Sequence, residues 1–191
     1  MKRALVAVAA LWMIAGVTGC GGAQEAKTMS GDEPSNPVRN EGTAAFVSPK
    51  VDGTGFVPTH VEAMAHTMKA GGQTYPAIIV HLANYDRGGR SYLPNPKTPG
   101  HRRVILNFSG PVGSALRVGA YGADVAPGAG HRFSLGVEGT SGSAGFEGVV
   151  TGVAELTRLT AEMVAGRVDL KDARGASINA TFTARLTRSR Y

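Results

Sequence analysis

Short stretches in which apolar and polar residues alternate, separated by glycine and proline, recur along most of this chain. In 61–68 the alternation has a period of two, which predicts a β-strand with two different faces. Gly71-Gly72 then separates it from a second apolar stretch at 75–82, which predicts a hairpin. Further strands are expected at 104–108, 115–121, 132–137, 164–170 and 177–186. Asp172-Ala173-Arg174-Gly175 between the last two predicts a second hairpin. Strands at this spacing predict an all-β fold, either an antiparallel β-sandwich or a barrel-like domain.

One segment, 152–165, fits two interpretations. Val153, Leu156 and Leu159 are spaced as on one face of a helix. Val149 and Val153, with a threonine midway between them, also fit the alternation of a strand. Threonine and glycine are frequent here and both weaken a helix, so the strand is favoured and one short helix stays the alternative.

The charge of the chain excludes one class of partner. The sequence holds 20 Lys and Arg against 14 Asp and Glu, a net charge of +6. Without Lys2 and Arg3, which belong to the expected leader, the net charge is +4. A nucleic-acid-binding domain needs clustered basic residues, so no nucleic-acid partner is expected.

The N-terminus has the order of an export signal. Lys2 and Arg3 precede an apolar run at 4–16, which is shorter than the roughly 20 residues of a membrane span. The run ends in Val17-Thr18-Gly19-Cys20, which resembles the lipobox of bacterial lipoproteins. The resemblance implies cleavage after Gly19, a lipid on the Cys20 sulfur, and anchoring in the cell envelope. Gly21 stands where an Asp would signal inner-membrane retention, so the resemblance favours the outer membrane.

These observations divide the chain into three parts. Residues 1–19 are the expected signal peptide. Residues 20–55, the lipidated cysteine and a flexible tether, are rich in Gly, Ser, Asn, Pro and charged residues, with few large apolar side chains to form a core. Residues 56–191 have the length and apolar content of a single β domain. Cys20 is the only cysteine, which excludes a disulfide within the chain.

One face of the first predicted strand carries potential metal ligands. Alternate residues lie about 7 Å apart on one face of a strand. The even-numbered face holds His60, Glu62, Met64, His66 and Met68. Imidazole and thioether ligands together suit copper, above all Cu(I), with His60, His66 and Met68 as first candidates and Met64 in support. The competing interpretation is an ordinary solvated face, with Val61, Ala63 and Ala65 turned towards the core. His81, on the second strand, can approach the same face.

No enzyme is expected and no catalytic or cofactor-binding residue is assigned. The chain has no Gly-x-Ser-x-Gly elbow, phosphate-binding loop or His-Glu-x-x-His motif. A long loop at 84–102, with Tyr85, Tyr92 and several prolines, is a second candidate contact surface. The sequence therefore predicts an envelope-anchored lipoprotein with a non-enzymatic binding or structural β domain. Its partner would be the membrane, through Cys20, together with an envelope protein or a glycan. The alternative is a copper-binding carrier.

Overall fold

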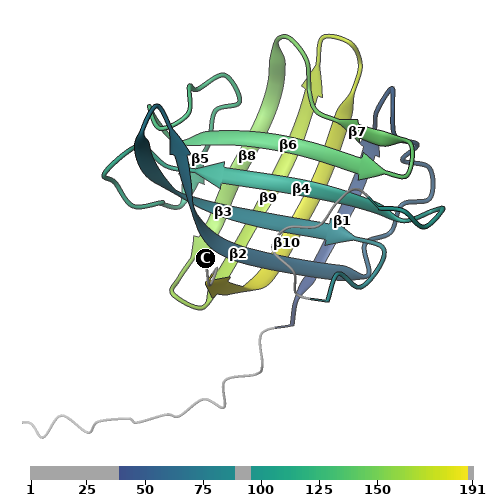
Figure 1. The fold of residues 1–191 in the computed structure, drawn as a ribbon, viewed down its shortest axis with the longest axis horizontal. Coiled ribbons are helices and arrows are strands. Elements are labelled where there is room, and N and C mark those ends of the chain that lie inside the picture. Colours follow the sequence, from purple (N-terminus) through teal and green to yellow (C-terminus); the bar gives the residue numbers. More distant parts are fainter. Residues whose placement is uncertain (1–38, 89–95, 189–191) are drawn as a thin grey trace, which may run out of the picture. The chain divides into compact units, whose positions relative to one another are not determined.

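The computed structural model describes residues 39–88 and 96–188, which contain ten strands and no helix (Figure 1). The strands are β1 (Glu41–Val47), β2 (His60–Ala70), β3 (Gln73–Ala83), β4 (Arg102–Ser109), β5 (Gly119–Ala120), β6 (Arg132–Gly139), β7 (Gly142–Ala144), β8 (Val150–Leu159), β9 (Met163–Asp172) and β10 (Ser177–Arg188). The all-β prediction is confirmed. The expected signal peptide, Cys20 and Tyr92 lie outside the described residues.

The strands form one mixed sheet that folds over into two layers (Figure 1). The front layer runs β2-β3-β4-β6-β7, with each neighbouring pair antiparallel. The rear layer runs β5-β8-β9-β10, with β1 on β10. The two layers are joined where the end of β10 pairs in parallel with β2 at Leu186–Arg188. The sheet does not close, so the domain is sandwich-like and the barrel alternative does not hold.

The register of the front layer separates a core face from an outer face. Val61 of β2 pairs with Leu82 of β3, which pairs with Val104 of β4, and all three are buried. The next core position of β2, Ala63, is also buried. Because side chains alternate along a strand, the even-numbered residues of β2 lie on the outer face. The predicted inward orientation of Val61 and Ala63 is confirmed.

Aromatic rings fill the centre between the layers. Phe108 of β4 contacts Phe133 of the same layer and Phe182 of the rear layer, with ring centroids 5.0 and 5.8 Å apart. Tyr121 packs edge-on against Phe108 at 5.2 Å, and its hydroxyl donates a hydrogen bond to the Arg117 carbonyl oxygen. The rings therefore tie the two layers to one hydrophobic core.

Both predicted hairpins form. Gly71 and Gly72 take positive φ angles of 57° and 78° between β2 and β3. In the turn between β9 and β10, Gly175 has a φ of 84°. The Asp172 carboxylate accepts backbone N–H bonds from Ala176 at 2.9 Å and from Glu147 at 3.1 Å. These bonds, the one from Glu147 above all, lower the pKa of Asp172.

Three local expectations need correction. The helix alternative for 152–165 is wrong, because β8 pairs with β9 along nearly its whole length. The tether does not extend to residue 55, because β1 pairs with β10 and buries Ala44 and Phe46 in the core. Only Gly119–Ala120 of the strand expected at 115–121 is paired.

Among the described residues, no segment forms a helix of the length and apolar character that a membrane crossing requires.

Candidate functional site

The outer face of the front layer brings charged side chains together. Its rows follow from the register: Glu62 lies opposite His81, and Arg103 lies opposite Glu138 on β6. Arg87, in the loop after β3, reaches back over this face, and its Nη1 donates to Glu62 Oε2 at 2.7 Å. Arg103 forms a second ion pair with Glu138. His81 therefore lies within a network of two arginines and two carboxylates, and its predicted approach to this face is confirmed.

His81 is the most unusual member of this network. Its side chain is buried, with 4% of the residue exposed. Neither ring nitrogen has a hydrogen-bond partner among the residues that the structure describes. Burial, followed by the positive charges of Arg87 and Arg103, lowers the pKa of His81 to about 3. The imidazole is therefore neutral at physiological pH, because protonation would bury a third positive charge beside Arg87 and Arg103.

The described ends of the loop at 84–102 contact each other. Asn84 donates from Nδ2 to the Gly100 carbonyl at 2.8 Å and accepts the Arg102 N–H at 2.7 Å. The rings of Tyr85 and His101 stack at a centroid distance of 4.5 Å and an interplanar angle of 3°. These contacts close the base of the loop, and Arg87 anchors its first part over the charged network.

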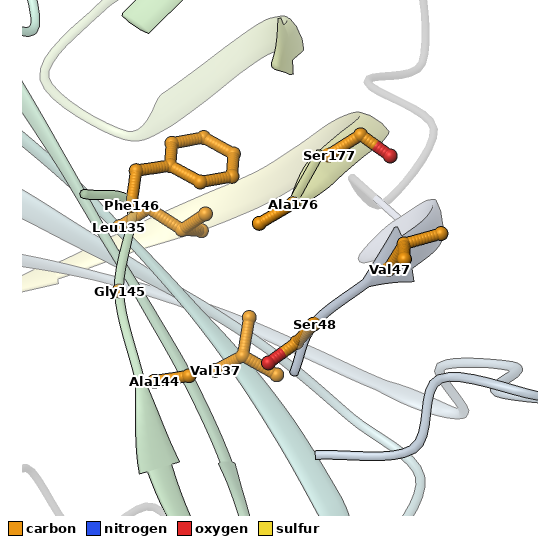
Figure 2. A pocket seen from close by; sticks show the side chains of 9 residues that line it. All are labelled: Val47, Ser48, Leu135, Val137, Ala144, Gly145, Phe146, Ala176 and Ser177. Carbon is orange, nitrogen blue, oxygen red and sulfur yellow. The ribbon is translucent and has the colours of Figure 1, made fainter. Parts of the chain in front are cut away.

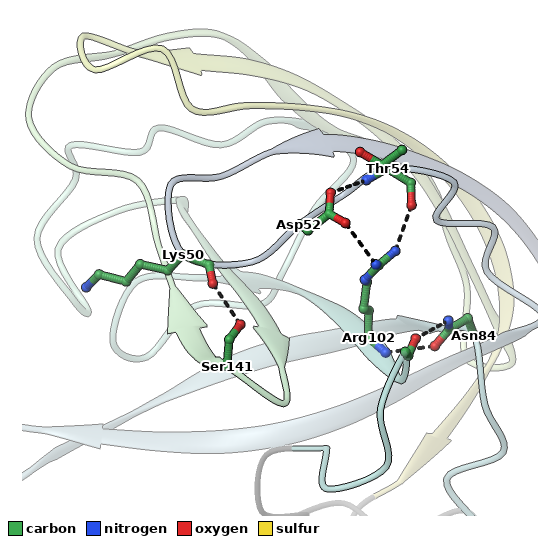
Figure 3. Close-up of polar contacts among 7 residues, drawn as sticks. Lys50, Asp52, Thr54, Asn84, Arg102 and Ser141 are labelled. Carbon is green, nitrogen blue, oxygen red and sulfur yellow. Dashed lines mark hydrogen bonds and ion pairs between the residues drawn. The ribbon is translucent and has the colours of Figure 1, made fainter.

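A second group of contacts holds the segment after β1 to the front layer (Figure 3). Arg102 donates to the Thr54 carbonyl at 2.8 Å and pairs with Asp52 at 3.2 Å. The Thr54 N–H bonds to Asp52 at 2.9 Å, and this bond is the main reason that the pKa of Asp52 is lowered. Ser141 donates to the Lys50 carbonyl at 2.8 Å. The segment is therefore part of the domain, contrary to the tether prediction.

The structure separates the predicted copper ligands. His60 lies six residues from His66 on the same strand, about 20 Å away, so the two imidazoles cannot share an ion. His60 instead contacts the Thr59 hydroxyl through Nδ1 at 2.9 Å. Met64, His66 and Met68 stay together on the outer face, all half-buried. The Met68 sulfur accepts a hydrogen bond from Asn107 Nδ2 at 3.3 Å.

A small apolar hollow, with room for about one water molecule, opens between the layers (Figure 2). It lies where β1 ends, beside the β6–β7 hairpin and the start of β10. Nine residues line it: Val47, Ser48, Leu135, Val137, Ala144, Gly145, Phe146, Ala176 and Ser177. Val47 at its rim is 62% exposed. The hollow is thus an open apolar feature next to two strand ends.

Sequence reasoning missed the hollow and most of the charged network. Arg103 lies next to the first residue of a strand and Arg87 lies in a polar loop, positions typical of solvated side chains. The pairing of Arg103 with Glu138 depends on the β4–β6 register, which a single sequence does not reveal. The hollow depends on the packing of strands far apart in the chain.

The described residues hold no group of three or more His, Cys, Asp or Glu placed to bind a metal ion. Comparison with protein-family models, with curated proteins and with solved structures found no match for this chain.

Proposed function

We propose that this protein is an envelope lipoprotein, anchored in the outer membrane through a lipid on Cys20, whose β domain binds another envelope protein without catalysing a reaction. The anchor rests on the residues Val17-Thr18-Gly19-Cys20 and on the basic and apolar residues before them. Two or more acyl chains on one residue give stable membrane attachment, whereas a single chain does not. The domain begins close to residue 40, which leaves about twenty residues between it and the anchor.

The apolar hollow is the observation that carries the binding role. Seven of its nine lining residues have apolar side chains or none, and Ser48 and Ser177 are the exceptions. A glycan loses hydrogen bonds to water when it binds, so its site would need several polar groups to replace them. An apolar side chain of a protein needs none, and its burial is favourable. The composition of the hollow therefore favours a protein partner.

The neighbouring strand edges suggest how this partner binds. Among the described residues, β7 pairs only with β6, and β1 pairs only with β10. Each strand therefore has an edge available for main-chain hydrogen bonds. An extended segment that adds to β7 would form main-chain bonds and place one apolar side chain against the apolar lining of the hollow. We propose such an extended segment as the occupant.

The anchor is tested by metabolic labelling with a fatty acid. The wild-type protein is expected to incorporate label and to fractionate with the outer membrane. The Cys20→Ser variant is expected to lose the label and the membrane association. A labelled Cys20→Ser protein, or an unlabelled wild type, would contradict the anchor.

The hollow is tested by photo-crosslinking in intact cells. A photoreactive residue at Val47, at the rim, is compared with one at Val57, which is similarly exposed at 66% but does not line the hollow. We expect a discrete protein adduct from position 47 that position 57 does not give. Ala144→Phe, which fills the hollow, should remove the adduct while circular dichroism stays unchanged. Equal adducts from both positions, or an adduct that survives Ala144→Phe in a folded protein, would refute the proposed site.

A further inference from the structure

We propose that Met64, His66 and Met68 bind one Cu(I) ion on the outer face of the β2–β3–β4 layer. This site is separate from the hollow and does not depend on the partner proposed above. All three residues lie on one face of β2, because they are alternate residues of one strand that pairs with β3 in continuous register. All three are half-buried, so each side chain packs on the sheet and keeps some access to solvent.

The contact between Met68 and Asn107 places the sulfur of Met68. Met68 pairs with Tyr75 on β3, whereas Asn107 lies on β4 opposite Ile79. The Met68 sulfur nevertheless lies 3.3 Å from Asn107 Nδ2. The side chain must therefore run diagonally over β3, and the residue midway along this path is Ala77.

Ala77 makes this path possible and brings the sulfur towards the other two ligands. Ala77 is the cross-strand partner of His66, and its methyl group leaves room above β3. Directly opposite residues of an antiparallel pair have Cβ atoms about 5 Å apart. Met64 is the next residue along the same face and lies opposite Ile79. The Met68 sulfur thus lies above β3 beside the His66 position. There it is within reach of two flexible side chains on β2, the Met64 thioether and the His66 imidazole.

Asn107 gives independent evidence that polar atoms beside the Met68 sulfur lack strong hydrogen-bond partners. Its Oδ1 is buried and has no hydrogen-bond partner among the described residues, and its amide nitrogen has only the weak acceptor of a thioether. An ion bound to the Met68 sulfur would replace this weak bond and leave the amide beside the metal.

The ligand types select the ion. Thioether sulfur and neutral imidazole are soft or intermediate ligands, which favour Cu(I) over the harder divalent ions. Zn(II) prefers cysteine, histidine and carboxylate ligands, and the described residues offer no group of three such side chains close together. Arg132 lies on the same row as His66 and Ala77, two strands beyond Ala77, and its charge opposes a divalent ion more than a monovalent one. The site is therefore expected to discriminate in favour of a monovalent soft ion.

The test is an anaerobic Cu(I) titration of the full chain carrying Cys20→Ser, so that no thiolate competes. A chromophoric Cu(I) chelator serves as the competing ligand. We expect one Cu(I) per chain, with affinity reduced at least tenfold by His66→Gln and by Met68→Leu. Sulfur and nitrogen neighbours of the copper should appear in X-ray absorption spectra, and the sulfur contribution should fall in Met68→Leu.

Two matched controls keep the test decisive. His60→Gln changes a histidine on the same strand outside the site, and Met163→Leu changes a half-buried methionine on the rear layer. Both should leave the affinity within twofold of the parent. Met→Leu conserves volume, so the variants should fold, which circular dichroism checks. Absence of Cu(I) binding, equal loss in His60→Gln, or Zn(II) binding as tight as Cu(I) would overturn the proposal.

Discussion

The buried His81 makes the stability of the domain depend on pH in a range where carboxylates contribute little. The pKa of His81 is about 3 in the folded protein, against 6.5 for an ordinary histidine. As the pH falls below 6.5, the unfolded chain binds a proton at His81 and the folded chain does not. The free energy of unfolding therefore falls from its full value above pH 6.5 and continues to fall towards pH 3.

The magnitude follows from the two pKa values. Between pH 7.5 and pH 5, the difference in proton binding lowers the free energy of unfolding by about 2 kcal/mol. The loss would reach about 4 kcal/mol at pH 3, where other groups also titrate. The groups around His81 are Arg87 and Arg103, with their partners Glu62 and Glu138.

The assay is urea denaturation at pH 7.5, 6.5, 5.5 and 5.0, with wild type compared with His81→Leu. Leucine removes the titrating group and leaves no partner unsatisfied, because neither ring nitrogen bonds to a described residue. We expect the wild type to lose about 2 kcal/mol over this range and the variant to lose much less. Burial also lowers the pKa of His131, but His131 is present in both proteins and cancels in the difference. A wild type with flat stability, or a variant with the same slope, would refute the reasoning.

Three further predictions concern the architecture. A fragment of residues 39–191 should fold, and one of residues 56–191 should not, because the second lacks β1 and the buried Phe46. Cooperative thermal melting is the measurement, and a cooperative transition in the shorter fragment would support the prediction that the tether extends to residue 55. Phe108→Ala should cost about 3–5 kcal/mol in urea denaturation because it empties the centre of the aromatic cluster, and a loss below about 1 kcal/mol would place the core elsewhere. Gly53→Ala should lower the melting temperature, since its Cβ would lie 2.1 Å from the Phe46 carbonyl oxygen. Gly55→Ala meets no atom within 4 Å and adds only the strain of a φ of 65°, so it should lower it less, and the reverse order would contradict this packing.

The strands β2, β3, β4 and β6 and both hairpins could be predicted because their signals are local. Period-two alternation assigns residues of β2 to two faces, and glycines mark the turns at Gly71-Gly72 and Gly175. The segment at 152–165 was ambiguous because its apolar spacing fits two periods. The pairing of β8 with β9 decides it, and that pairing is a tertiary contact.

The candidate sites were only partly predictable. The alternation placed Met64, His66 and Met68 on one face, and the structure keeps them there. The sequence could not show that Met68 crosses β3 to Asn107, since that contact spans 39 residues and depends on two strand registers.

By itself, the sequence determined the strand-forming segments, their apolar faces and the turns, because these depend on neighbours a few residues apart. Only the tertiary structure decided which strands meet. It recruited Glu41–Val47 to β10, joined β10 to β2 in parallel, and buried Arg103 with Glu138. A short apolar stretch such as β1 is stable as a strand only when a distant strand provides main-chain hydrogen-bond partners and there is a core for it to cover. The residues of β1 alone do not show which strand that is.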